Sequence, residues 1–105
     1  MLLLDDDDEL RVAPSDDEKL LAESLGPEGL RAIDDAIAQV VKQRWQKVAM
    51  VAIQAIKTGG QATSEERVQL HVRRIIALVE LGTLEAQGNL RRPRFSEVRL
   101  PVVAR

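Results

Sequence analysis

The spacing of apolar residues changes once along this chain, at Gly82. Before it, apolar residues recur every three or four positions, which is the period of a helix with one buried face. After it, Leu84 and Ala86 alternate with polar residues, and so do Val98 and Leu100, as in half-buried strands. The order predicts a mainly α-helical domain that ends in a β-hairpin.

Helix-start and helix-stop signals divide the part before Gly82. Residues 15–18 (Ser-Asp-Asp-Glu) and 63–66 (Thr-Ser-Glu-Glu) have the form of a capping box, in which a hydroxyl and a glutamate bind free amide groups. Gly26 and Pro27 predict the end of the first helix. The predicted helices cover about 16–25, 29–43, 45–57 and 64–81, and the hairpin strands cover about 83–88 and 95–100.

The segment from residue 28 to residue 57 allows either one long helix or two shorter ones. No glycine or proline interrupts the polar run at residues 42–44, which permits a continuous helix. The apolar stripe of Ile33 and Ile37 is rotated relative to the stripe of Trp45 and Ile56, however. We expect two helices, because this rotation and the usual length of helices both favour a break.

The net charge of -2 hides two unlike parts of the chain. Residues 1–35 carry twelve acidic and three basic side chains, whereas residues 36–105 carry five acidic and twelve basic ones. Like charges in the run of aspartates at 5–8 repel one another and favour an extended, solvated segment. We therefore expect an acidic, mobile arm at 1–14, a single domain at 15–100 and a frayed tail at 101–105.

The inventory of reactive side chains argues against enzymatic function. The chain has no cysteine and one histidine, which excludes disulfides, thiolate chemistry and the usual zinc sites. His71 has no acid–base partner that spacing nominates, and we interpret it as a helix-surface or core-edge residue. Gly59 and Gly60 lack the lysine of a phosphate-binding loop. We expect no catalytic residues, no metal, no cofactor and no small-molecule substrate.

The sequence shows neither the pattern of a signal peptide nor that of a membrane-spanning segment. Residues 2–4 are apolar, but aspartates follow them at once, which is unlike a signal peptide. No apolar stretch approaches the ~18 residues that span a bilayer. These features favour a cytoplasmic bacterial protein without a membrane role.

Three helices followed by a hairpin is the order of a winged helix-turn-helix, with a further short helix in front of it. A closer resemblance rests on residues 45–49 (Trp-Gln-Lys-Val-Ala), Arg73, residues 76–89 and residues 95–100 (Phe-Ser-Glu-Val-Arg-Leu). Together they resemble a small C-terminal domain found in many bacterial proteins of unknown function. The resemblance implies a winged-helix-like fold and no activity. Residues 1–27 and the Gly59–Gly60 loop have no counterpart in that family.

A protein-interaction module is the function that the pattern favours. The two apolar stripes between residues 30 and 56, together with Met50, Val51 and Ile53, exceed what one face of a small domain buries. The surplus predicts either a protein partner or a second copy of the chain. The alternative is that the N-terminal leucines cover it.

Duplex DNA binding is the second hypothesis, because arginines suit phosphate and guanine contacts. The candidate contacts to nucleic acid or to an acidic partner are Arg67, Arg73 and Arg74 on the last helix and Arg91, Arg92 and Arg94 on the wing. Glu65 and Glu66 at the start of that helix oppose this function, since phosphates repel them. The scarcity of aromatic residues argues against single-stranded nucleic acid. The acidic arm offers a third possibility, in which it folds back and masks the basic wing.

Overall fold

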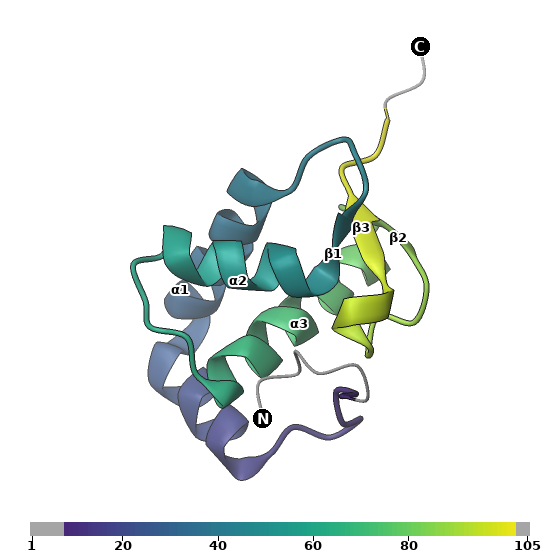
Figure 1. The fold of residues 1–105 in the computed structure, drawn as a ribbon. Helices are drawn as coiled ribbons and strands as arrows, with labels where there is room; N and C mark the ends of the chain where they lie inside the picture. The colour runs from purple at the N-terminus through teal and green to yellow at the C-terminus, as the bar shows by residue number, and fades with distance from the viewer. Residues whose placement is uncertain (1–7, 103–105) are drawn as a thin grey trace.

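A computed structural model describes residues 8–102 of the chain and shows three helices with a small sheet at one end (Figure 1). The helices are α1 (Asp16–Val40), α2 (Val48–Thr58) and α3 (Glu65–Glu80). The strands are β1 (Gln46–Lys47), β2 (Glu85–Gln87) and β3 (Glu97–Arg99), and the short 3-10 helix η1 (Pro93–Phe95) precedes β3. The predicted mainly α domain with a terminal hairpin is confirmed.

Helix α1 begins at the first predicted cap and contains the first predicted break. The hydroxyl of Ser15 accepts a hydrogen bond from the amide of Glu18 at 3.2 Å. Gly26 has φ 66° and ψ -175°, a left-handed conformation that glycine adopts without a steric penalty, and Pro27 starts the next turn. The break is therefore a kink, after which the helix continues to Val40.

The chain forms two helices across residues 28–57, but it places Trp45 in neither of them. Helix α1 ends at Val40 and α2 begins only at Val48, so the predicted helices 29–43 and 45–57 extend too far into this connection. The side-chain amide of Gln46 explains the turn. It accepts from the amide of Lys42 at 2.8 Å and donates to the carbonyl of Val40 at 3.4 Å.

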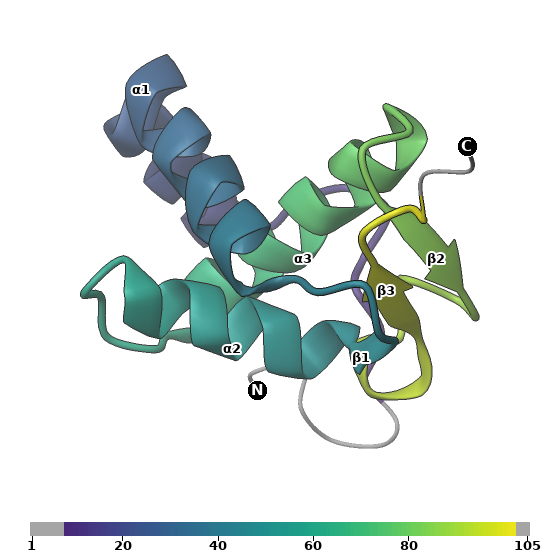
Figure 2. The same ribbon diagram turned by 90° about the horizontal axis from the view of Figure 1, so that it is seen from above.

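The sheet has the order β1-β3-β2, and both pairings are antiparallel (Figure 2). Val98 in the central strand lies opposite Gln46 on one side and Ala86 on the other. The hairpin of β2 and β3 agrees with the prediction, whereas β1 was not expected. Gly88 follows β2 with φ 83°, and a Cβ there would lie 2.7 Å from the carbonyl oxygen of Phe95. The hairpin loop therefore requires glycine at this position.

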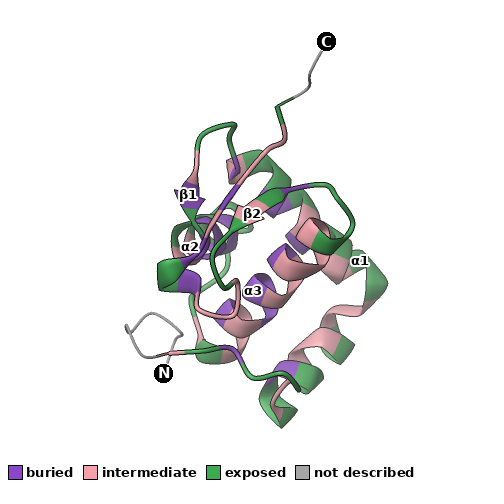
Figure 3. Cartoon of the chain, turned by 90° about the vertical axis from the view of Figure 1, so that its right-hand side faces the viewer, coloured by how far each residue is buried: buried purple, intermediate pink, exposed green. Residues whose placement is uncertain are grey.

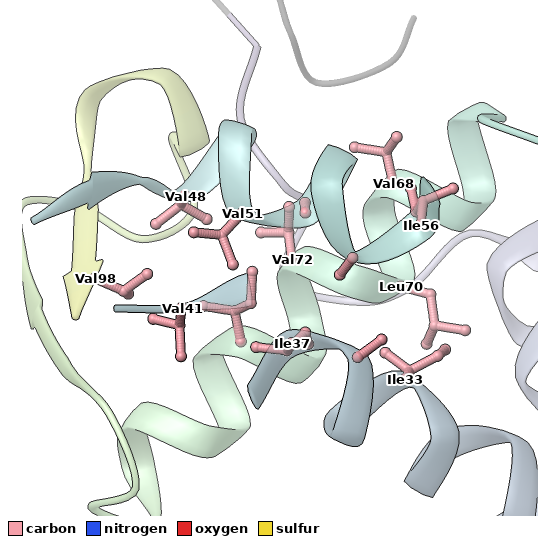
Figure 4. Packing of buried hydrophobic residues seen from close by; sticks show 14 of the residues in the cluster. Ile33, Ile37, Val41, Val48, Val51, Ile56, Val68, Leu70, Val72 and Val98 are labelled. Carbon is pink, nitrogen blue, oxygen red and sulfur yellow. The ribbon is translucent and has the colours of Figure 1, made fainter. Parts of the chain in front are cut away.

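The core is aliphatic, as the composition predicts, and it lies where the three helices meet the sheet (Figures 3 and 4). Its largest fully buried members come from every layer of the fold: Ile37, Val48, Val51, Ile56, Val68, Val72, Ile75 and Val98. Val98 and Leu84 fix the sheet to the helices, because both are buried in this cluster. The packing sets the positions of the residues described below.

Residues 8–14 lie against the domain. Leu10 is only 2% exposed, and its amide donates to the carbonyl of Arg91 at 2.6 Å. The sequence predicts a mobile arm over residues 1–14; in its described part, residues 8–14, the buried side chain of Leu10 packs into the core cluster. Residues 1–7 of that arm and residues 103–105 of the predicted frayed tail lie outside the described residues.

Two negative findings concern the described range 8–102. None of its helices combines the length and apolar character needed to cross a bilayer. Within the same range, no three acidic or histidine side chains gather as potential ligands of a metal ion.

Candidate functional site

Arg73, one of the predicted contact residues, is bound to a buried carboxylate of the same chain. Its Nε lies 2.5 Å from Oε2 of Glu18, and its Nη2 lies 3.1 Å from Oε1. The Glu18 side chain is 3% exposed and that of Arg73 is 27% exposed. A bidentate arginine–carboxylate pair of this kind is among the stronger hydrogen-bonded pairs in proteins.

The same guanidinium also holds the N-terminal segment. Nη2 of Arg73 donates to the carbonyl of Arg11 at 3.1 Å, and Nη1 donates to the carbonyl of Val12 at 3.2 Å. We call this set of contacts, formed by Arg73, Glu18 and the carbonyls of residues 11 and 12, the Arg73 junction. It joins three segments that are distant in sequence: residues 8–14, the first turn of α1 and the middle of α3.

A cavity of about 270 Å³ opens beside the Arg73 junction. Acidic residues dominate its lining, which includes Asp8, Glu9, Asp17, Glu65 and Glu66. Hydrogen bonds from its own backbone amide and from Ser64 lower the pKa of Glu66, which keeps this carboxyl group ionised. The electrostatics here disfavour a phosphate group.

Arg74, the next residue along α3, pairs with a different part of α1. Its Nε and Nη2 donate to the two carboxylate oxygens of Asp34 at 2.9 and 2.8 Å. This hydrogen bonding raises the pKa of Arg74. Both side chains are about one-quarter exposed, so this pair is better solvated than the Arg73 junction. It connects α3 to the second half of α1.

Arg91 on the hairpin loop completes the attachment of the N-terminal segment. Its Nε donates to the carbonyl of Leu10 at 2.7 Å, and its Nη1 lies 3.6 Å from Oε1 of Glu9. Together with the backbone bond from Leu10, these contacts hold residues 9 and 10 against the loop. A wing arginine and an α3 arginine thus bind the same short segment.

The remaining predicted residues lie on other surfaces. The guanidinium of Arg92 lies over the ring of Phe95, 4.9 Å from its centroid, and Arg94 is exposed on η1. The backbone amide of Arg67 donates a hydrogen bond to the hydroxyl of Ser64, which caps α3. Arg67 also borders an apolar groove. The six arginines therefore do not form a single basic face.

The surface of α3 is more acidic than its arginine content indicates. All of α3 is described, and its exposed residues are Glu65 and Glu80, while its arginines are partly covered. The helix has α1, α2 and the N-terminal segment packed around it (Figures 1 and 3). No continuous basic side of α3 faces solvent in this conformation.

An aromatic contact that sequence reasoning missed lies beside the sheet. The guanidinium of Arg99 lies 4.3 Å from the ring centroid of Trp45, the single tryptophan of the chain. Alternation along the strands puts Lys47, Glu97 and Gln87 on the side away from buried Val98. We call this side the sheet face; its residues are Trp45, Lys47, Glu85, Gln87, Glu97 and Arg99.

The alternation at residues 97–99 belongs to the predicted hairpin, whereas residues 45–47 give no such signal, because their buried middle residue is the polar Gln46. In each triplet the middle residue is buried and its neighbours are not. The helical spacing on either side of residues 45–47 predicts a helix position for Trp45, and the structure instead places it before β1 and α2.

Comparisons with protein-family models, with curated proteins and with solved structures find no match for this chain.

Proposed function

We propose that this chain is a non-enzymatic protein-interaction module of the winged-helix type. The topology supports the winged-helix part of the proposal. A helix, a strand, two helices and a two-stranded hairpin follow one another, and the first strand pairs with the last. This order also suits the resemblance to the bacterial C-terminal domain of unknown function.

The observation that carries the proposal is the internal use of the α3 arginines. A winged helix that reads DNA places a basic helix face in the major groove. Here Arg73 and Arg74 bind Glu18 and Asp34 of the same chain, and the exposed residues of α3 are acidic. Entry of this surface into the groove would bring carboxylates toward phosphates and require the Arg73–Glu18 and Arg74–Asp34 pairs to open.

The sheet face is the surface we assign to the partner. Tryptophan and arginine are the residues most often found at energetically dominant positions of protein interfaces. Trp45 and Arg99 are partly exposed there, and the exposed Lys42, Arg44 and Lys47 lie on or next to the same connection. On the sheet face itself Lys47 and Arg99 balance Glu85 and Glu97, and Arg99 pairs with Glu85 at 3.1 Å. The neighbouring Lys42 and Arg44 add the positive charge that fits a partner with an acidic surface.

Site-specific photocrosslinking tests this assignment. A photoreactive residue placed at Lys47 reports on the sheet face, and one at Lys57 at the far end of α2 is the matched control (Figure 2). We expect a discrete protein adduct from position 47 in the native host, lost in Trp45→Ala and Arg99→Ala. Equal adducts from both positions, or none from position 47, would contradict the proposal.

Sedimentation at several protein concentrations tells a second copy of the chain from another partner. A dimer that forms with rising concentration and disappears in Trp45→Ala identifies the second copy. If the chain stays monomeric at every concentration, the partner of the sheet face is a different protein.

Duplex DNA binding under control of the N-terminal segment is the second candidate. The observation that favours it is that residues 9–12 bind both Arg91 of the wing and Arg73 of α3. Removing residues 1–14 would release Arg73 and Arg91 from these contacts. If this candidate is correct, the shortened chain binds random duplex DNA with an affinity that falls steeply with salt, unlike the full chain. Unchanged DNA affinity and unchanged salt dependence would exclude it.

A further inference from the structure

A groove of about 110 Å³ lies where α1, the end of α2 and the start of α3 meet. Its walls are mainly apolar and include Leu25, Gly29, Ile33, Ala36 and Ile56. His71 also lines it, and we call it the His71 groove. The volume equals roughly three to four water molecules at about 30 Å³ each, which is the space of a molecule with a few carbon atoms.

His71 has a fixed tautomer. The side chain is 3% exposed, and its Nδ1 lies 2.7 Å from the carbonyl oxygen of Arg67. A carbonyl only accepts hydrogen bonds, so Nδ1 carries the proton and donates it. In the neutral ring Nε2 is then an acceptor on the other side of the imidazole.

Nε2 has no hydrogen-bond partner in the described part of the chain. The bond from Nδ1 to Arg67 is the hydrogen bond that the structure of residues 8–102 gives His71. Every fully buried side-chain nitrogen in this range has a hydrogen-bond partner, so an unpaired Nε2 is not fully buried. Nε2 therefore keeps some access to solvent, and the groove is a solvent-accessible space that His71 lines. The groove thus combines apolar walls with one unpaired acceptor.

The surroundings keep the imidazole neutral. Burial lowers the pKa of His71; the hydrogen bond to Arg67 opposes this shift, and the charge of Arg67 adds to it. In the described part of the lining, Arg67 is the one charged residue, while α1 and α2 contribute apolar side chains. At neutral pH the ring consequently offers a lone pair, which attracts a hydrogen-bond donor and repels a carboxylate.

We propose that the His71 groove binds a small neutral aliphatic alcohol, whose hydroxyl donates to Nε2 while its carbon atoms contact the apolar walls. Water would satisfy Nε2 but not the walls, because small apolar cavities are poorly hydrated. An alkane would satisfy the walls and leave Nε2 unpaired, which is unfavourable for a largely buried acceptor. The inference is independent of the partner assigned to the sheet face.

The single histidine makes the experiment direct, since its ring nitrogens give the only imidazole signals in a ¹⁵N spectrum. The probe is 2-methyl-1-propanol at millimolar concentration, with 2-methylbutane and 2-methylpropanoate as controls. We expect a saturable shift of the Nε2 resonance with the alcohol and a further fall in the pKa of His71, because the hydroxyl binds the neutral ring. The alkane should bind up to about tenfold more weakly, because it lacks the one hydrogen bond to Nε2 and a net hydrogen bond changes affinity by about that factor.

Two variants separate binding in the groove from a general solvent effect. Ala32→Leu narrows the groove at an exposed position of its lining, so the fold and the Nε2 signal should persist while the shift disappears. His71→Phe removes the acceptor, and binding followed by Ile33 and Ile56 methyl signals should weaken by up to about tenfold. A non-saturable shift, a shift that survives Ala32→Leu, or a rise in the pKa of His71 with the carboxylate would overturn the proposal.

Discussion

The two sides of α3 bury their polar groups in different ways. Arg73 and His71 are two positions apart, which places them about 200° apart around the helix axis. On the Arg73 side, each of the three guanidinium nitrogens donates to the Glu18 carboxylate or to a backbone carbonyl of the same chain. On the His71 side, apolar residues pack against the ring and leave one nitrogen at a groove. One side therefore stabilises the fold, and the other is available to a ligand.

The comparison shows why residue type alone misleads about function. Arginine on a helix next to a wing is typical of DNA readers, yet here the partners of Arg73 and Arg74 are Glu18 and Asp34. Those acidic residues lie about 40 to 55 positions earlier in the sequence. Only the packing of α1 against α3 reveals that the charges meet.

The largest effect should come from breaking the Arg73 junction. Arg73→Met keeps the length of the side chain but leaves the Glu18 carboxylate buried without a counter-charge. Removing one partner of a buried pair typically lowers the free energy of unfolding by about 3–5 kcal/mol. Urea unfolding measures this, and adding Glu18→Gln should restore part of the loss. A change below about 1 kcal/mol would show that the junction is largely solvated.

Leu10 should contribute the next largest share. Leu10→Ala removes the buried side chain that anchors the N-terminal segment, and substitutions of this kind cost about 2–5 kcal/mol in cores. We expect the lower end, because a terminal segment relaxes more easily than a core helix. Hydrogen exchange at the Leu10 amide, which donates to Arg91, should also accelerate. Unchanged stability together with unchanged exchange would contradict the anchoring role.

Arg74 is the matched control for Arg73. Arg74→Met breaks a pair whose two side chains are partly exposed, so the free energy of unfolding should fall by about 1 kcal/mol or less. The difference between the two neighbouring variants in the same urea experiment is the informative quantity. Equal losses would mean that burial does not distinguish the two pairs.

The smallest effect concerns pH on the His71 side. Because the folded state lowers the pKa of His71, the unfolded chain binds more protons as pH falls below about 6.5. The contribution of His71 to stability is therefore present above that pH and declines as pH falls toward the folded-state pKa. Unfolding measured at pH 7.5 and 5.5 should show a smaller pH dependence in His71→Phe than in the parent chain. An identical dependence in both would contradict a neutral, buried imidazole.

Local signals in the sequence predicted most of the helices and the hairpin. Ser15 and Gly26 act through contacts or conformations within a few residues, so their effects could be anticipated. The two-residue strand β1 could not, because Gln46 joins the sheet only when β3 from far along the chain lies beside it. The same reason applies to the candidate sites. Trp45 meets Arg99, and Glu18 meets Arg73, through tertiary packing that no local pattern encodes.

The central claim is that the arginines of α3 stabilise the chain instead of contacting nucleic acid. A titration of the full chain against fluorescent random duplex DNA at low ionic strength tests it most directly, with a repeat at higher salt. The account predicts no saturable binding at either salt concentration. Binding whose log affinity falls linearly with log salt, and which Arg73→Met and Arg74→Met weaken, would contradict it.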